Sequence, residues 1–443
     1  MAATGWATGS TCRYNKLNII TVTIIMPYNF IPHDEPFFDD NERWVALADN
    51  YALSPLEREE DLDAVRAICR HLSLYNEFAV NALENRINYL VGCGHQYTIR
   101  PKKHSDPSPS IIEQVETWLD EFLEMNHWHR RQQEIVRRMD RDGEVFIRLF
   151  PTADGMTRLR FVDPERVRTP EQLINVPNER MGISFDTHDA ETIHGYWIDG
   201  QYVPYAQVQH RKANVDSIVP RGLPLFFPVR KNLYRAEKLL RNMSIVAEIQ
   251  SAIAIIRKHQ SASQSAVDKF VNDKRDAAAP GFGPTLNRYG PGTILDASAT
   301  IDYQFPVSAI DAGRYVTVLQ AELRAIAARL VMPEFMLTSD ASNANYSSTM
   351  VAEGPAVRMF QRLQHELSCE DVTLFQRAIR VACSAGRLPH DVLSQIEIHP
   401  VAPSLAVRDR LRETQADKIL FDAGVLSKQE FALRNNLEGD GRQ

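Results

Sequence analysis

Asp163, Glu165 and His210 are the residues of this sequence whose types could support hydrolysis. A carboxylate near an imidazole can help the ring act as a general base on water. Acidic residues near a histidine also occur often by chance, and Asp163-Pro164-Glu165 is typical of a turn that ends a strand. A hydrolase with a dispersed site is therefore the weakest of the functional alternatives.

The sequence carries none of the compact signatures that hold a cofactor or activate a nucleophile. It has no GxxxxGK[ST] phosphate loop, no GxSxG turn and no HExxH zinc helix. Cys93 and His95 lie close together, but two further ligands at short spacing are missing. Asp140 and Asp142 lack the later acidic residue that a calcium loop requires. We therefore expect no cofactor and no metal, and predict that the chain is not an enzyme.

The balance of charge argues against tight binding of nucleic acid. The chain has 50 Lys and Arg residues against 57 Asp and Glu residues, a formal net charge of −7. Proteins that hold phosphates firmly usually carry a basic excess. Basic residues occur at most in short pairs such as Lys102-Lys103 and Arg130-Arg131, and this dispersed arrangement is typical of solvated faces. Any DNA contact should therefore be loose, local or sliding.

The cysteines and the apolar runs indicate the compartment. The five cysteines form no CxxC pair, and an odd number argues against a disulfide framework, so we expect reduced thiols inside a cell. No apolar run reaches the ~18–20 residues that cross a bilayer, so we expect no membrane contact. Residues 19–26 either form a weak signal-peptide core or precede a true start at Met26. The second is favoured, because no small-residue cleavage site follows.

Apolar periodicity predicts a mixture of helices and strands. Helical spacing covers 61–91, 111–140, 229–259, 316–330 and the stretch from 348 onward. Extended patterns cover 95–100, 144–150, 158–162, 195–203, 294–305 and 396–399. Pro355 falls within the last helical pattern and predicts a kink or a delayed start there. The mixture of helical and extended patterns predicts an α+β fold. Since 443 residues are too many for one ordinary core, we expect two or three lobes.

The segment 229–259 is the most apolar of the predicted helices. Leu239, Met243, Val246 and Ile253 form a stripe at helical spacing, and further Leu and Ile residues widen it. A helix with so broad an apolar surface has to be covered on several sides. We expect its own fold or neighbouring subunits to supply that cover.

Five short segments occur in a fixed order along residues 60–435. They are Arg221-Gly222-Leu223-Pro224 before the long helix, Pro291-Gly292-Thr293-Ile294-Leu295, Ile326-Ala327 leading to Met332-Pro333-Glu334-Phe335-Met336-Leu337, Asn343-Ala344-Asn345-Tyr346-Ser347-Ser348, and Ala416-Asp417 leading to Gly424-Val425-Leu426-Ser427-Lys428-Gln429-Glu430. In order and spacing this set resembles phage portal proteins of the lambda and HK97 type. Pro355 and the first 25 residues have no counterpart in that pattern.

The resemblance implies a portal-type subunit with long helices in its stem, wing and crown and a β-rich wing and clip lobe. The implied parts are an N-terminal arm at 1–60, a helical wing part at 61–143, a β-rich wing and clip part at 144–228, a stem helix at 229–260, wing strands and a helix at 261–337, a tunnel loop at 338–348, a kinked helix at 349–388 and a C-terminal crown at 389–443. The stripe of Leu239, Met243, Val246 and Ile253 would pack the stem helix.

The resemblance also implies a function. Copies of the chain would form a ring, usually a dodecamer, at one capsid vertex of the virion after assembly in the host cytoplasm. The ring would conduct double-stranded DNA during packaging and ejection. Its expected partners are the terminase large subunit, the major capsid or scaffolding protein and a head–tail adaptor. Another structural protein of head assembly is the alternative.

The implied tunnel loop would face the DNA. Its channel-facing residues would be Asp340, Ser342, Asn343, Asn345, Tyr346 and Ser347. The loop has no Lys or Arg, so it offers few anchors for phosphate and lets DNA slide. The alternative is an ordinary surface connection.

Overall fold

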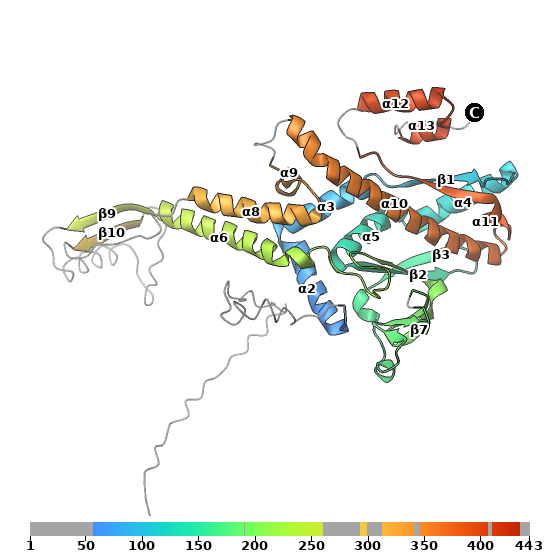
Figure 1. The fold of residues 1–443 in the computed structure, drawn as a ribbon, viewed down its shortest axis with the longest axis horizontal. Helices are drawn as coiled ribbons and strands as arrows, with labels where there is room; N and C mark the ends of the chain where they lie inside the picture. Colours follow the sequence, from blue (N-terminus) through green and yellow to red (C-terminus); the bar gives the residue numbers. More distant parts are fainter. Residues whose placement is uncertain are drawn as a thin grey trace, which may run out of the picture. The chain divides into compact units, whose positions relative to one another are not determined.

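The computed structural model describes residues 56–189, 191–259, 293–298, 312–340, 346–405 and 410–434. Its helices are α2 Glu59–Tyr75, α3 Glu77–Leu90, α4 Pro109–Met125, α5 Trp128–Asp142, α6 Arg230–Ala252, α8 Ala312–Leu330, α9 Glu334–Thr338, α10 Tyr346–Ser384, α11 Val392–Gln395, α12 Arg410–Asp422 and α13 Lys428–Arg434. Its strands are β1 Gln96–Pro101, β2 Glu144–Pro151, β3 Thr157–Val162, β4 Glu179–Arg180, β5 Ile183–Phe185, β6 Ile193–Ile198, β7 Gln201–Pro204, β8 Val208–Lys212, β9 Ile253–His259, β10 Thr293–Ser298 and β11 Ile396–Val401. Long helices and small sheets share the chain (Figure 1), which confirms the α+β fold class.

The described strands form four small sheets. One has the order β3-β2-β8 and another the order β4-β5-β6-β7, both antiparallel. β1 pairs with β11 antiparallel, and β9 pairs with β10 in parallel. The predicted hairpin at 195–203 is β6 and β7, and its turn residues Asp199 and Gly200 have φ values of 51° and 75°. Positive φ at both positions is what a two-residue hairpin turn of type I′ requires.

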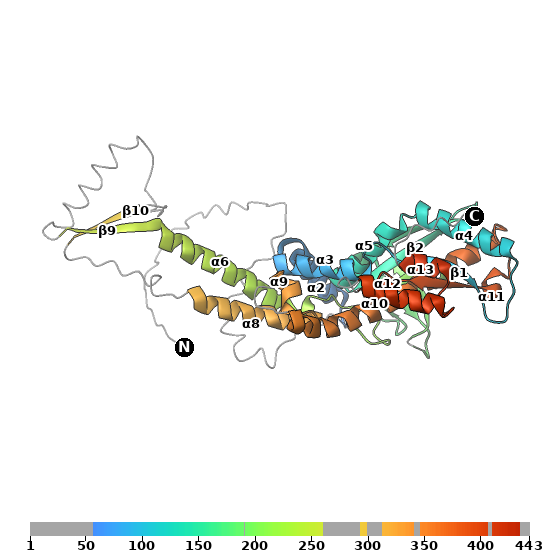
Figure 2. The same ribbon diagram turned by 90° about the horizontal axis from the view of Figure 1, so that it is seen from above.

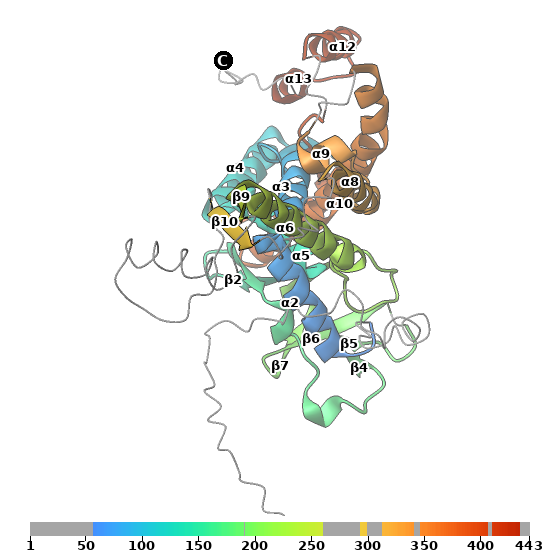
Figure 3. The same cartoon turned by 90° about the vertical axis from the view of Figure 1, so that its left-hand side faces the viewer.

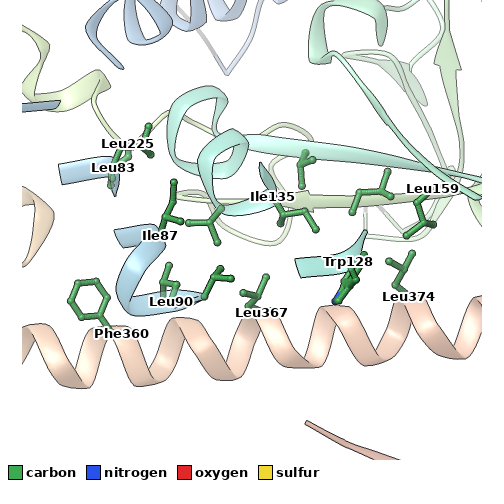
Figure 4. Packing of buried hydrophobic residues seen from close by; sticks show 14 of the residues in the cluster. Leu83, Ile87, Leu90, Trp128, Ile135, Leu159, Leu225, Phe360, Leu367 and Leu374 are labelled. Carbon is green, nitrogen blue, oxygen red and sulfur yellow. The ribbon is translucent and has the colours of Figure 1, made fainter. Parts of the chain in front are cut away.

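β2 is buried on both faces and divides the core in two. Val145, Ile147 and Leu149 point into a large cluster with α3, α5 and α10, whose buried side chains Figure 4 shows along α10. Phe146 points the other way, into a second cluster with Tyr196 of β6. Figures 1 and 3 accordingly show α10 and the β4–β7 sheet on opposite sides of β2.

Two predicted helices are each broken in the structure. The pattern at 61–91 forms α2 and α3, which separate at Asn76, and the Asn76 side chain accepts from the N–H of Ala79 to cap α3. The pattern at 111–140 forms α4 and α5, which separate at Asn126 and His127, where φ of His127 is 49°. Asparagine competes for backbone hydrogen bonds and tolerates turn conformations. Apolar spacing alone does not reveal such breaks, because helical spacing of apolar residues resumes after each of them.

The long helix predicted at 229–259 ends early. α6 stops at Ala252, and Ile253–His259 is strand β9, paired in parallel with β10. The prediction of helix for residues 253–259 was therefore wrong. The sequence Ile253-Ala254-Ile255-Ile256 is rich in β-branched residues, which favour strands. Among the described helices, none is long and apolar enough to span a membrane.

α10 is a continuous helix of 39 residues that contains Pro355. It begins at Tyr346, so the delayed start that Pro355 suggested does not occur. A proline inside a helix removes one backbone donor, and its ring crowds the carbonyl one turn back. The kink predicted at Pro355 stays a prediction. The buried residues beyond it, Phe360, Leu367 and Leu374, face the main core (Figure 4) and hold the helix in place.

Local sequence signals set the end of α12 and the start of α13. Gly424, at φ 71°, follows α12 as a left-handed terminator. Ser427 accepts from the N–H of Glu430 at 3.2 Å, and the Glu430 carboxylate accepts from the N–H of Ser427 at 3.1 Å. This reciprocal pair is a capping box at the start of α13. It gives a physical reason for the Gly424 to Glu430 segment noted in the sequence.

Candidate functional site

α6 and α8 form a helical hairpin, which Figures 1 and 2 show side by side. At the base of the hairpin, Leu233 and Ala236 of α6 are fully buried in the main core. Asn232 of α6 donates to the Glu322 carboxylate of α8 at 2.6 Å, and Arg235 lies 3.8 Å from that carboxylate. The apolar and polar contacts together fix the base of the hairpin to the rest of the fold.

The rest of the hairpin leaves apolar side chains uncovered. Ile245 of α6 is 46 % exposed, and Val316 and Val318 of α8 are 40 % and 51 % exposed. Met243 and Val246 are only half-buried. Fully burying an exposed side chain of this kind contributes about 1.5–3 kcal/mol, and covering these half-exposed ones would contribute roughly half of that each. This surface is therefore suited to contact with another protein surface.

The four residues proposed from the sequence to pack the stem helix occupy different environments. Leu239 is half-buried and packs against the main core. Met243 and Val246 lie further along α6, beyond that core. Ile253 is the first residue of β9, so it does not belong to the helix at all.

The carboxylate of Glu144, at the start of β2, is the centre of a buried polar cluster. Its Oε1 accepts from Arg221 Nε at 2.7 Å and from Arg66 of α2. Its Oε2 accepts from His210 Nε2 at 2.9 Å and from the N–H of Gly222 at 3.1 Å. The four side chains are almost completely buried. The cluster therefore joins α2, β2 and β8 to the segment that enters α6.

Arg221 extends this cluster toward the sheet of β4, β5, β6 and β7. Its guanidinium donates to the carbonyl oxygens of Pro164, Val167 and Met181 at 2.8, 2.9 and 2.8 Å. It also lies 5.2 Å from the ring centroid of Phe146. The planar fork of arginine can serve several acceptors at once, which a lysine cannot do.

Burial and charge act in opposite directions on the titration of this cluster. Burial alone would raise the pKa of Glu144, but the charges of Arg221 and Arg66 and the hydrogen bond from His210 hold it well below its ordinary value. Burial lowers the pKa of Arg66 to about 10, although Glu144 opposes the shift. Burial also lowers the pKa of His210, and Glu144 again opposes it. Near neutral pH the cluster therefore holds one carboxylate between two guanidinium groups and a neutral imidazole.

Two glycines allow the chain to form this cluster. A Cβ on Gly222 would lie 2.0 Å from the carbonyl oxygen of Gly143, and a Cβ on Gly143 would lie 2.4 Å from the carbonyl carbon of Leu223. Gly143 also has φ of 84°. The two backbones touch directly, so a side chain at either position would separate them. This contact explains why a glycine follows Arg221 in the segment before α6.

The connection between α9 and α10 is shorter than the tunnel loop predicted at 338–348. Thr338 is the last residue of α9, while Tyr346 and Ser347 are the first residues of α10. Asp340 is exposed in the connection between the two helices. Ser342, Asn343 and Asn345 lie outside the described residues. The helix at 346–348 corrects the predicted loop boundary and leaves the role of the loop as a proposal.

The candidate hydrolytic residues each have a different partner. His210 is buried, bonded to Glu144 and stacked on Phe146 with ring centroids 4.1 Å apart. Asp163 accepts from an arginine of α5 at 2.8 Å, and Glu165 accepts from an arginine of α2 at 2.6 Å. Neither carboxylate is hydrogen-bonded to the imidazole, so the three residues singled out in the sequence do not form one site.

The possible half metal site at Cys93 and His95 is explained by packing. His95 is buried, and its ring nitrogens contact Ser368 Oγ at 3.1 Å and the carbonyl oxygen of Leu90 at 2.8 Å. Cys93 is exposed. Within the described ranges no group of three or more His, Cys, Asp or Glu residues could hold a metal ion.

A match to one protein family covers most of the chain. Residues 54–364 match the family model of phage portal proteins of the lambda family, more than half of the chain. The chain belongs to the lambda family of phage portal proteins. Within this portal protein, the matched range includes both the Glu144 cluster and the α6–α8 hairpin.

Several solved structures are similar to this portal protein. The neck of the empty GTA particle, computed with C6 symmetry, has 14 % identity and a TM-score of 0.45 over 83 % of this chain and 93 % of that chain. The neck of the native GTA particle, computed with C12 symmetry, has 15 % identity and a TM-score of 0.41 over the same shares. An HK97 family phage portal protein from Corynebacterium diphtheriae has 12 % identity and a TM-score of 0.30 over 78 % of this chain and 95 % of that chain. No curated protein matches the chain.

Sequence reasoning missed the buried clusters. Arg66 and Glu144 are 78 residues apart. In a second cluster, Asp371 of α10 accepts from Tyr97, Gln132 and Arg211 at 2.6, 2.9 and 2.7 Å. The only local signal was the Arg221-Gly222 pair, because the other partners come from distant segments.

Proposed function

We propose that copies of this portal protein assemble into a dodecameric ring at one capsid vertex of a tailed phage. Double-stranded DNA passes through the ring during packaging and ejection. The observation that supports the ring is the α6–α8 hairpin, because it leaves Ile245, Val316 and Val318 uncovered within the described part of the subunit. Neighbouring copies in a closed ring would bury these side chains.

The proposed ring has partners at both of its ends. The terminase large subunit docks on it during packaging, and a head–tail adaptor follows once packaging is complete. The major capsid or scaffolding protein holds it in the shell. The ring is assembled in the host cytoplasm and remains in the virion. In this proposal the portal protein is a structural and conducting component without catalysis of its own.

The tunnel loop provides the test of DNA conduction. The stretch between Thr338 and Tyr346 contains no Lys or Arg, so it offers passing DNA no fixed partner for phosphate. We propose that it faces the channel. Replacing Asn343 and Asn345 with lysine adds two positive charges per subunit at that point.

Asn343→Lys/Asn345→Lys rings are expected to assemble normally but to package DNA more slowly or to retain it more tightly. The measurement is an in-vitro packaging assay, with microscopy of the same rings. Asn343→Gln/Asn345→Gln is the control and should package as the unmodified protein does. Normal packaging by lysine-bearing rings would show that the loop is not at the constriction, and lost rings would assign it to a subunit contact.

A further inference from the structure

β2 and β3 gather arginines that are scattered in the sequence. Arg148 and Arg160 are direct partners across the two strands, and Phe150 and Arg158 are the next pair on that face. Arg131 of α5 lies over the ring of Phe161, on the opposite face of β3, and its positive charge and that of Arg160 repel. We call Arg148, Arg158 and Arg160 the arginine face. It continues the sheet surface whose inner part, at Phe146, is covered by the second core cluster.

Within the described residues no salt bridge joins the arginine face to a carboxylate. The pKa of Asp199 is lowered first by its hydrogen bond from Arg166 and also by the charge of Arg148, so this carboxylate lies close to the face but is already paired. The Nε of Arg148 is buried without a hydrogen-bond partner in the described structure. A buried guanidinium nitrogen normally has a partner, so this atom indicates a missing acceptor.

The arrangement costs stability in the isolated subunit. Like charges directly opposite on neighbouring strands are destabilising, and Arg148 and Arg160 are such a pair. Phe150 is 40 % exposed, and the Arg148 guanidinium lies 4.9 Å from its ring centroid. A bound anion would remove the repulsion and supply the acceptor for Arg148.

We propose that the arginine face binds the phosphate backbone of duplex DNA, as a site separate from the proposed tunnel loop. Arginine forks bind phosphate oxygens in pairs. Residues on one face of a strand repeat every ~6.8 Å, so Arg158 and Arg160 present successive positive groups along an extended polyanion. Because the protein as a whole carries −7, such contact is local and independent of base sequence. This inference rests on the proposed function, which brings DNA to the ring.

Covalently closed circular DNA separates this surface from the channel, because a closed circle cannot thread a closed ring. The probe is a fluorescent closed minicircle added to the purified full-length protein at low salt. Arg158→Ala/Arg160→Ala should weaken its binding roughly tenfold or more and lower the slope of log affinity against log salt by about 2, for two lost phosphate contacts. Both side chains are exposed, so the variant should keep its thermal midpoint or raise it.

The control variant removes the same charge elsewhere. Arg358 and Arg362 are exposed on α10, and Arg358→Ala/Arg362→Ala should bind the minicircle as the unmodified protein does. Arg158→Lys/Arg160→Lys keeps the charge but loses the fork, so it should bind with intermediate affinity.

Three results would overturn the inference. The unmodified protein could fail to bind the minicircle at low salt, the two alanine variants could lose affinity equally, or polyglutamate could displace the minicircle at concentrations where a polyphosphate cannot. Mass photometry of the same samples reports rings independently. Rings that do not bind the minicircle would reject DNA binding by the arginine face but not the proposed portal function. Minicircle binding by a protein that forms no rings would support the arginine face and contradict the proposed portal function.

Discussion

Glu144 is the single residue on which the junction between the helices and the sheets depends most. Its carboxylate is fully buried and accepts from Arg66, Arg221 and His210. Two buried guanidinium groups would lose their counter-charge without it. Removing one partner of a buried ion pair lowers stability far more than replacing the whole pair with well-packed apolar residues.

Glu144→Gln should lower the free energy of unfolding by about 3–5 kcal/mol. The amide keeps the shape and some hydrogen bonds but leaves the two arginines uncompensated. Urea unfolding followed by circular dichroism measures the loss. The matched control is Glu165→Gln, whose carboxylate pairs with Arg70 but is 41 % exposed, so the loss there should stay below about 1 kcal/mol. Equal losses in the two variants would contradict the role given to Glu144.

His210 makes the stability of this cluster depend on pH. Burial lowers its pKa below the ordinary value, although Glu144 opposes the shift. In the unfolded chain the imidazole takes up a proton near pH 6.5, and in the folded protein only at lower pH. The stability is therefore complete above that pH and is lost as the pH falls toward the folded pKa, by at most ~1.4 kcal/mol per pH unit.

His210→Gln can still donate to Glu144 but does not titrate. Its unfolding free energy should fall less steeply between pH 7 and pH 5 than that of the unmodified protein, with part of the dependence remaining because burial also lowers the pKa of His95. Urea unfolding at several pH values provides the measurement. The same slope in both proteins would mean that His210 does not titrate in this way.

At the scale of the elements, apolar spacing predicted the positions of the helices better than their ends. The stripe through Leu239, Met243 and Val246 continues to Ile253, yet the helix ends at Ala252 because the next residues pair with β10. That pairing partner lies in a distant segment, so the local pattern could not predict it. Asn76 similarly divides the helical pattern at 61–91, because its side chain caps α3.

The uncovered part of the hairpin predicts where subunits meet. Met243→Glu/Val246→Glu should reduce ring formation much more than helix content, because the two residues are half-buried within the subunit and extend beyond its core. Size-exclusion chromatography and circular dichroism measure the two effects. Asn242→Glu/Ser244→Glu adds the same charge at exposed polar positions of α6 and should disturb the rings less. Unaltered rings in the first variant would show that this helix surface is not a subunit contact.

At the scale of the whole molecule, the sequence predicted the α+β class and the family from segments in a fixed order. It could not predict the chemistry of those segments. Arg221 and Gly222 are recognisable in the sequence, but their role depends on Glu144 and Gly143, which β2 brings to them. The arginine face was hidden for the same reason, since the basic residues appeared dispersed until β2 and β3 paired.

The ring is the central claim, and electron microscopy of the purified full-length protein tests it most directly. The uncovered apolar side chains of the α6–α8 hairpin and membership of the lambda portal family lead us to expect closed rings with a central hole, and class averages should show twelve-fold symmetry. Mass photometry of the same sample should give one dominant mass, near twelve times the 50.4 kDa subunit. A stable monomer of 50.4 kDa with no rings over a range of concentration and salt would contradict the account.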